Sequence, residues 1–393
     1  MKILLIHTYY QQKGGEDGVF RLEQLLLGQT EHVRTLTFQN LSGWRGAAQF
    51  LLSLWNVTAA KKLKKAISEY RPDIIHMHNL HFAIGPIAIR VANKAGIPVV
   101  LTLHNYRLLC PSTTLISKGR LFTDSVNASF PWKAVANKAY RNSVFQTFWL
   151  AFVVWFHKKA GTWKMVNKYI VLTDFAKTLF VNSSFGVSEQ KYVVKPNFVD
   201  SIDLQPAKRM DRFLFIGRLS HEKGIQLLLD AFRHIDDELY VAGDGPLKEE
   251  LELACKQNGN IKYAGSLDSD GVREAMKHCV ALIFPSIWYE GMPMTLLEAF
   301  ASGTPVIAGN LGAMSSMVQH GYNGLHFQPG QTEDLIVQVK YWQSLSHEEK
   351  YAYSVNARTT YESFYTPGSN LEKCLTIYQS VINPPRDFKV TQN

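Results

Sequence analysis

Short runs of apolar, β-branched residues recur along the chain, and stretches with a helical spacing of apolar residues separate them. Strands that alternate with helices are typical of βαβ units, whose parallel sheets are covered by helices on both faces. In the first half this pattern predicts strands at Lys2–His7, Asp73–Met77, Pro98–Leu103, Lys168–Leu172 and Lys191–Val194. In the second half it predicts strands at Arg212–Gly217, Glu238–Ala242, Asn260–Ala264, Val280–Phe284, Thr304–Ala308 and Gly324–Phe327.

The two sets of strands predict an α/β protein with two doubly wound domains, at residues 1–200 and 201–370. The prolines, acids and short polar residues of Pro196–Met210 are typical of a linker. Open parallel sheets bind ligands beyond the carboxyl ends of their strands, so two facing domains would enclose a ligand cleft. We expect a last helix, within residues 371–393, to cross back to the first domain.

Composition narrows the class of protein. With 46% hydrophobic and 19% charged residues, the 393-residue chain is typical of a globular protein with large cores. Its start shows no charged segment followed by an apolar signal segment, and its four cysteines form no C-x-x-C pair. These features favour a reducing, cytoplasmic setting, without a disulfide framework or a zinc site.

The net charge of +9 predicts a partner that carries phosphate: a nucleotide, a nucleic acid or an anionic lipid. One basic stretch, His157 to Lys159, directly follows the aromatic-rich run Phe145–Phe156. This run is shorter than the ~20 residues that span a bilayer. Two interpretations stay open: a buried core helix, or a helix at a membrane surface with basic residues against lipid phosphates.

Glycines follow the first strand of each predicted domain. Gly14-Gly15 precedes a predicted helix, and Gly217-Arg218 precedes Lys223-Gly224 and another helix. Backbone N–H groups at a helix start bind anions. The cations Arg218 and Lys223 lie in a loop at the carboxyl end of a strand, which is where parallel sheets bind ligands. The first of these loops does not carry the dinucleotide pattern G-x-G-x-x-G. Asp268-Ser269-Asp270 is similar to a D-x-D metal motif, but we interpret it as a helix cap.

Two glutamates flank the start of a helix in the second domain. Glu290 precedes a Gly-Met-Pro break after the strand Val280–Phe284, and Glu298 lies inside the helix that follows. Acids are common near helix starts because the helix dipole favours negative charge there. The pair alone therefore does not define a site.

The order of the motifs along the chain is more informative than any one motif alone. They are Gly14-Gly15, H-M-H-N (His76–Asn79), T-L-H-N-Y (Thr102–Tyr106), P-N-F-V-D (Pro196–Asp200), G-R-L-S-H-E-K-G (Gly217–Gly224), A-G-D-G-P (Ala242–Pro246) and E-x7-E (Glu290–Glu298). This series resembles the retaining family-4 glycosyltransferases of GT-B fold, the glycosyltransferase group 1 type, and in particular a branch that assembles bacterial polysaccharides. The resemblance covers nearly the whole chain and implies two Rossmann-like domains, a nucleotide-sugar donor on the second domain, and no metal or cofactor.

The resemblance assigns roles residue by residue. Arg218 and Lys223 would neutralise the donor diphosphate as it leaves, while Glu290 would hold hydroxyls of the transferred sugar and Glu298 those of the ribose. His104 would stabilise the reacting sugar or its leaving group through hydrogen bonds. The remaining donor-binding residues are expected to be Gly15, Gly217, Gly291, Met292, Pro293, Met294, Thr295 and Leu296.

The acceptor side is less defined. Glu16, His78 and Asn79 are the residues expected to contact acceptor or donor. The resemblance implies a UDP- or GDP-sugar donor and a saccharide or lipid-linked saccharide acceptor. The basic charge and the aromatic run Phe145–Phe156 extend this to contact with an anionic membrane, at the inner face of the cytoplasmic membrane.

Two other classes of function fit part of the sequence. A sugar-nucleotide epimerase of GT-B fold would share the donor pocket. A basic nucleic-acid-binding protein would share the charge, but its cations would not be tied to glycine loops, and the chain carries no recognisable nucleic-acid module. We therefore expect no nucleic-acid partner.

Overall fold

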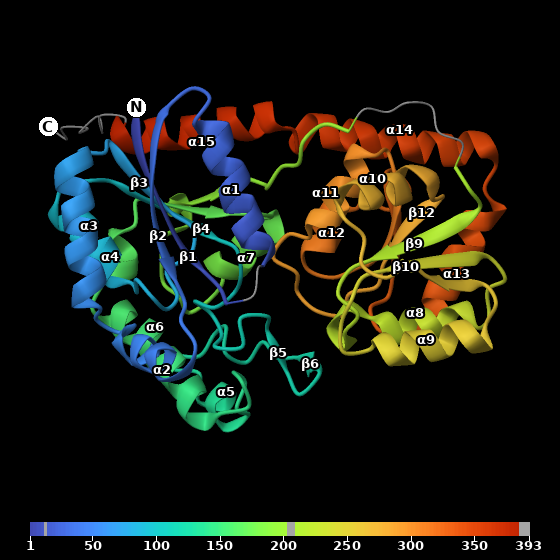
Figure 1. Cartoon of the computed structure of the whole chain (residues 1–393), viewed down its shortest axis with the longest axis horizontal. Helices are drawn as coiled ribbons and strands as arrows, with labels where there is room; N and C mark the ends of the chain where they lie inside the picture. Colours follow the sequence, from blue (N-terminus) through green and yellow to red (C-terminus); the bar gives the residue numbers. More distant parts are fainter. Residues whose placement is uncertain (12–13, 203–208, 385–393) are drawn as a thin grey trace, which may run out of the picture.

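The computed structural model describes residues 1–11, 14–202 and 209–384, and each half of the chain contains a parallel six-stranded sheet (Figure 1). The first sheet has the order β2-β1-β3-β4-β7-β8 and the second the order β11-β10-β9-β12-β13-β14. The strands of the first are β1 (Lys2–Tyr9), β2 (His32–Gln39), β3 (Ile74–Met77), β4 (Val99–Leu103), β7 (Lys168–Val171) and β8 (Tyr192–Val194). Those of the second are β9 (Arg212–Ile216), β10 (Glu238–Ala242), β11 (Ile261–Tyr263), β12 (Ala281–Phe284), β13 (Val306–Gly309) and β14 (Gly324–Phe327).

Helices cover both sheets (Figure 1). Around the first sheet lie α1 (Gly15–Leu27), α2 (Gly43–Leu52), α3 (Val57–Tyr70), α4 (Ile87–Lys94), α5 (Trp132–Ala136), α6 (Val144–Lys159) and α7 (Asp174–Val181). The second half contains α8 (Ile225–Phe232), α9 (Lys248–Gln257), α10 (Ser269–His278), α11 (Met294–Ala301), α12 (Ala313–Met317), α13 (Thr332–Ser344), α14 (His347–Phe364) and α15 (Pro367–Ile382). Short elements complete the fold: β5 (Ile116–Ser117), β6 (Arg120–Leu121), η1 (Thr162–Met165), η2 (Glu189–Lys191) and η3 (His221–Lys223).

Each strand predicted from an apolar run is present, but the pattern misses β2. This strand pairs with β1 at the edge of the first sheet, and its residues alternate between exposed and half-buried. An edge strand needs no continuous apolar run, because only part of it packs against the core. The D-x-D segment is a helix cap, as interpreted above: Asp268 Oδ1 accepts a hydrogen bond from Gly271 N at 2.8 Å and begins α10.

Helix α6, which contains the aromatic run, packs one side into the core of the first domain. Leu150, Ala151 and Val153 are buried in the first domain, whereas Phe145 is 58% exposed at the start of the helix. No helix among the described residues has the length and apolarity needed to cross a membrane.

Helices α14 and α15 run along one edge of the molecule and reach from the second sheet to the first (Figure 1). Tyr361 of α14 lies in a core cluster of the second domain, whereas Cys374 and Tyr378 of α15 pack with Ile3 and Leu5 of β1. The helix on the first domain begins at Pro367, before the boundary expected at residue 371. Residues 385–393, and the linker residues 203–208, lie outside the described part.

A buried ion pair fastens α1, α15 and the end of β8 together. Glu23 Oε2 accepts a hydrogen bond from Lys195 Nζ at 2.9 Å, and Lys195 also donates to Asn370 Oδ1 of α15 at 3.1 Å. Burial alone would raise the pKa of the Glu23 carboxyl, but the Lys195 ammonium holds that pKa well below its usual value. Burial would likewise lower the pKa of Lys195, and Glu23 raises it instead.

Replacing Lys195 should therefore destabilise the first domain. Lys195→Met leaves a buried carboxylate without its cation, so the free energy of unfolding at pH 7 should fall by about 3–5 kcal/mol. The stabilisation by Glu23 is present above its unfolded pKa, 4.5, and is lost as the pH falls through the lowered native value, so wild type and variant should converge in acid. Urea unfolding followed by circular dichroism measures both effects.

Lys65→Met is the matched control, because the Lys65 side chain is 78% exposed and its pair with Glu69 is a surface pair. We expect this variant to lose less than about 1 kcal/mol. Equal losses in the two variants would contradict a structural role for the buried pair.

Candidate active site

A cavity of about 370 Å³ lies between the two domains, at the carboxyl ends of strands from both sheets. Its walls come from the segment after β1, the segment after β4, and the segment between β12 and α11. The predicted donor-binding and catalytic residues that line it are Gly15, His104, Lys223, Glu290, Gly291, Met292, Pro293, Met294 and Thr295, and the predicted acceptor-side residue Glu16 lines it too. The structure therefore brings together side chains that are far apart in the sequence.

Glu290 is held rigidly in the segment that leads from β12 to α11. Its Oε1 accepts hydrogen bonds from Lys223 Nζ at 2.6 Å, from Ser286 Oγ at 2.8 Å and from Trp288 Nε1. All these donors meet the same oxygen, and none of the described residues donates to Oε2. One carboxylate oxygen thus fixes the side chain, and the other is available to a ligand hydroxyl.

Lys223 reaches Glu290 from a turn in the second domain. It ends the short helix η3, and its Nζ lies 5.2 Å from the centroid of the Trp288 ring. The next residue, Gly224, has φ +73°, and a Cβ there would stand 2.1 Å from the carbonyl oxygen of Pro285. Glycine is therefore required at this position so that the turn can approach the end of β12.

The helix N-termini on the two sides of the cavity differ in charge. Helix α11 has no side-chain cap and no acid in its first turn, and its residues Met294 and Thr295 line the cavity. Helix α1 carries Glu16 and Asp17 in its first turn, and Asp17 accepts a hydrogen bond from Gly14 N at 3.0 Å. Free N–H groups and the helix dipole attract anions, so the α11 side favours a phosphate and the α1 side does not.

His104 and Glu16 face the cavity from the first domain. Burial lowers the pKa of His104 to about 3, so the imidazole is neutral at pH 7. Burial raises the pKa of Glu16 to about 7, although a hydrogen bond from Tyr10 and the charge of Arg107 oppose this shift. The first domain therefore offers a neutral imidazole, and a carboxyl group that is partly protonated at neutral pH.

Two contacts bring the domains together beside these groups. Tyr106 Oη donates a hydrogen bond to the backbone carbonyl of Glu290 at 3.1 Å, and the rings of Phe175 and Tyr289 lie 4.8 Å apart. A Cβ at Gly291 would stand 2.3 Å from the carbonyl oxygen of His104. The absence of a side chain at Gly291 allows the two domains to approach at the site.

Some residues expected at the site do not line this cavity. Arg218 is exposed beside Gly217, and the Leu296 side chain is buried in the core of the second domain, while Glu298 is half-buried on α11. His78 is buried behind His104. Asn79 donates to the Thr8 carbonyl at 2.8 Å and accepts from His81 N at 3.0 Å, so it supports the loop behind the cavity.

Sequence reasoning missed a second cation near the cavity and a buried acid. Arg107 is only 7% exposed, and its Nε and Nη1 have no hydrogen-bond partner among the described residues. The sequence feature that could have identified Arg107 is its position shortly after β4, because Arg218 occupies a similar position after β9. The signal for Glu23 was an acid on the apolar face of α1, at helical spacing from Phe20 and Leu27.

Family models match both halves of the chain. "Glycosyltransferase Family 4" matches residues 38–201, and "Glycosyl transferases group 1" matches residues 200–360. An uncharacterized glycosyltransferase of Methanocaldococcus jannaschii is 26% identical over 85% of this chain and 86% of its own length. Another from the same organism is 33% identical, but the match spans 34% of this chain and only 36% of the relative.

A named relative and a solved structure extend the comparison. The lipopolysaccharide 1,6-galactosyltransferase of Salmonella typhimurium is 27% identical over 58% of this chain and 67% of its own length. The crystal structure of Anabaena HepE in complex with UDP superposes with a TM-score of 0.68 at 17% identity, covering 97% of this chain and 100% of that one. This structural likeness shows the fold.

Two facing parallel-sheet domains with a cavity between them form the GT-B fold. The chain belongs to the family-4 glycosyltransferases, and it is a transferase.

The close approach at Gly291 gives a test of the site geometry. Gly291→Ala places a methyl group against the His104 carbonyl and should hold the domains apart, so glycosyl transfer should fall by about 10²-fold. The melting temperature should change little, because the clash lies at an interface and not in a core. Transfer assays and thermal melts measure the two quantities.

Gly259→Ala is the control, because a Cβ at Gly259 meets nothing within 4 Å. Its activity should equal that of the wild type. Full activity in Gly291→Ala would show that the cavity does not work in the closed arrangement.

Proposed function

We propose that the chain transfers a sugar from a nucleoside diphosphate donor, a UDP- or GDP-sugar, to a saccharide or lipid-linked saccharide in surface-polysaccharide assembly. The observation that carries the proposal is the interdomain cavity in which Lys223, Glu290 and the free N-terminus of α11 face His104. Its volume of about 370 Å³ falls in the range of small-molecule sites. The lipopolysaccharide galactosyltransferase relative supports the polysaccharide setting.

The second domain supplies what a leaving diphosphate needs. Negative charge grows on the diphosphate as the glycosidic bond breaks, so a preplaced ammonium and free helix N–H groups stabilise the transition state more than the ground state. Lys223 and the start of α11 are in place for this, and the exposed Arg218 stands in the preceding loop. We propose that these groups take the place of a divalent metal.

We propose that the reaction retains the configuration of the sugar without a covalent intermediate. The carboxylates that line the cavity are Glu16 and Glu290, and Glu290 is held by Lys223, Ser286 and Trp288. A carboxylate held by three donors is a poor nucleophile, and it is suited instead to bind sugar hydroxyls. The departing phosphate would then take the proton of the acceptor on the same face of the sugar.

A second cavity offers room for an extended acceptor. It has a volume of about 700 Å³, lies in the first domain, and is lined by the aromatic and amide side chains that saccharides contact. Tyr10 lines this cavity and hydrogen-bonds Glu16, which lines the interdomain cavity. An oligosaccharide could therefore run from one cavity past Tyr10 to Glu16, where its terminal hydroxyl would meet the donor.

Donor binding can be tested without knowing the acceptor. A ligand that binds the native state raises the melting temperature by mass action, so either UDP or GDP should raise it and ADP should not. Lys223→Met should lose most of that shift, and transfer by Glu290→Gln should fall by about 10²–10³-fold. Thermal melts and donor-turnover assays measure these effects, and EDTA should leave both unchanged.

Lys248→Met is the matched control, because Lys248 forms an exposed pair with Glu252 on α9 of the same domain. It should keep the full nucleotide shift. If no nucleotide shifts the wild type, the donor pocket is wrong; if the sugar nucleotide is interconverted without acceptor, the protein is the epimerase alternative.

We also propose that one end of the first domain contacts an anionic membrane. Helices α2, α5 and α6 gather there (Figure 1), and they expose Trp44 (77%), Trp132 (63%) and Phe145 (58%). Arg45 directly follows Trp44 and Lys133 directly follows Trp132 in the sequence, and Arg141 lies four residues before Phe145. Exposed aromatic rings with neighbouring cations suit the interface between lipid headgroups and acyl chains.

Vesicle binding tests this surface. The wild type should cosediment with vesicles that contain phosphatidylglycerol, and the variant Trp132→Ser/Phe145→Ser should bind several-fold less because it loses apolar contact area. Tyr351→Ser is the control, because Tyr351 is 72% exposed on the second domain. Equal binding to neutral phosphatidylcholine vesicles, or none to either kind, would contradict the proposal.

A further inference from the structure

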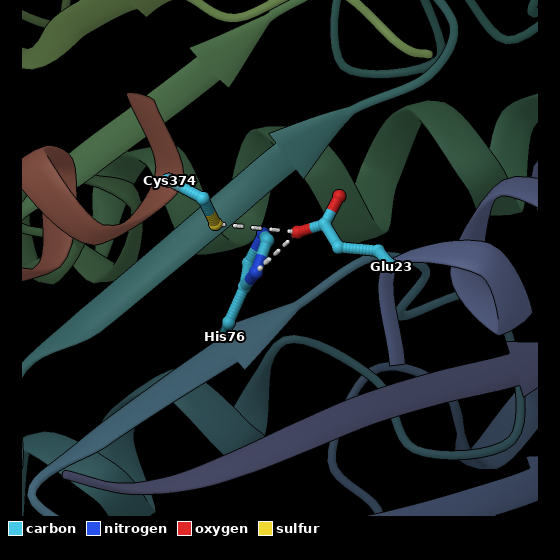
Figure 2. Close-up of side chains that lie close together, drawn as sticks. All are labelled: Glu23, His76 and Cys374. Carbon is cyan, nitrogen blue, oxygen red and sulfur yellow. Dashed lines mark hydrogen bonds and ion pairs between the residues drawn. The ribbon is translucent and has the colours of Figure 1, made fainter. Parts of the chain in front are cut away.

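A network of buried polar side chains lies behind His104. Glu23 is 2% exposed, and its Oε1 lies 3.2 Å from His76 Nδ1, 3.6 Å from Cys374 Sγ and 3.7 Å from His78 Nε2. Figure 2 shows how Glu23 from α1, His76 from β3 and Cys374 from α15 converge. The ammonium of Lys195 meets the other oxygen of the same carboxylate.

The types of residue in Figure 2 could hold a metal ion, but their contacts argue against one. Both ring nitrogens of His76 are already bonded, Nδ1 to Tyr378 Oη and Nε2 to Thr102 Oγ1, each at 2.7 Å. Lys195 brings a fixed positive charge to the carboxylate that the metal would need. The cluster is therefore a hydrogen-bonded network around one buried negative charge.

His78 connects this network to His104. The His78 ring stacks on the His104 ring with centroids 5.2 Å apart, and His78 Nδ1 lies 3.0 Å from His104 Nε2. The other nitrogen of His78, Nε2, is buried and has no hydrogen-bond partner among the described residues; its nearest charge is the Glu23 carboxylate, at 3.7 Å. His104 itself lines the interdomain cavity.

These contacts determine where the protons lie. Burial lowers the pKa of both histidines, so each ring is neutral and carries one N–H. The Glu23 carboxylate attracts the proton of His78 to Nε2, because an unprotonated nitrogen would present its lone pair to a negative charge. His78 Nδ1 is then an acceptor, and His104 must donate from its own Nε2.

We infer that Glu23 acts through His78 to hold His104 in its Nε2–H tautomer, so that His104 Nδ1 accepts a hydrogen bond from a hydroxyl group of the bound sugar. Glu23 and His78 are positioning residues, because neither lines the cavity. This inference deepens the proposed function and rests on it for the identity of the ligand. It assigns the recognised group as a hydroxyl donor, and not as an anion or a carbonyl.

Helix α15 takes part in the same arrangement. Tyr378 and Asn370 hold His76 and Lys195, the two side chains that bracket Glu23. The helix that crosses back from the second domain therefore fixes the charge that orients His104. Without α15, the Glu23 carboxylate would lose part of the hydrogen-bonded network that keeps it buried and ionised.

The tautomer of His104 can be read directly by NMR. In protein labelled with ¹⁵N-histidine, two-bond ¹H–¹⁵N spectra show which nitrogen of each ring carries the proton, and the His104 signals are those absent from His104→Gln. His157 is an internal reference, because its Nε2 donates to the Leu54 carbonyl, which can only accept. We expect wild-type His104 to match the Nε2–H pattern of His157 at pH 7.

His78→Leu removes the acceptor, so the two nitrogen signals of His104 should move toward each other as both tautomers become populated. The kcat for transfer should fall by about 10- to 100-fold, while KM for the donor changes little. The control is His157→Leu, because His157 is a buried histidine of the same domain that lies away from the cavity. This variant should leave the His104 signals and kcat unchanged. This control variant distinguishes the loss of the hydrogen bond to His104 from a general loss of packing in the first domain.

The outcomes distinguish the inference from the function on which it rests. An Nδ1–H pattern at His104 in the wild type, or an unchanged pattern in His78→Leu, would overturn the inference even if transfer is observed. The expected spectra in a protein that binds no nucleotide and transfers no sugar would support the tautomer and refute the function. If His78→Leu does not fold, Glu23→Asp replaces it as the test. This variant keeps the carboxylate and should retain the wild-type Nε2–H pattern of His104; loss of that pattern would overturn the inference.

Discussion

One buried carboxylate determines how the parts near the cleft fit together. Glu23 is ionised in a core, and a buried charge is stable only when it is paired and hydrogen-bonded. Its partners come from β3, from the end of β8 and from α15, so these segments must meet wherever α1 places the acid. Lys195 stands at the exit from the first sheet, where the chain leaves for the second domain. The same charge thus ties the domain crossing to the histidines behind the cavity.

The two helix N-termini give the opposite walls of the cleft a different charge. On the second domain, α11 has a free N-terminus next to Lys223, a combination that attracts phosphate. On the first domain, the acids of α1 fill the corresponding position and leave a neutral imidazole and a carboxyl group facing the cavity. In the proposed reaction, the diphosphate of the donor would therefore bind at the second-domain wall and hydroxyl groups of the sugars at the first-domain wall.

The sequence predicts the buried strands well, because each is a compact apolar run, and it misses β2, whose outer position requires no such run. It also predicts ten of the twenty residues that line the cavity, since the motifs follow strands whose carboxyl ends meet. The pairing of Lys223 with Glu290 could not be predicted, because it depends on how tightly the turn at Gly224 approaches β12. The Glu23 network was hidden for a related reason: its members are scattered from α1 to α15 and become a set only when packed.

The contacts between the domains also constrain how substrates enter. Opening the cleft would break the bond from Tyr106 to the Glu290 carbonyl and move Gly291 away from His104. The same motion would leave α15 on the first domain and α14 on the second, because each helix is packed into its own core. The change would then be confined to residues 196–198, before Val199 of the second-domain core, and to Thr366, between Tyr365 of that core and the start of α15. Because Glu23 and α15 stay together on one side of this hinge, the orientation of His104 would persist in the open cleft, and donor binding would meet an imidazole already in place.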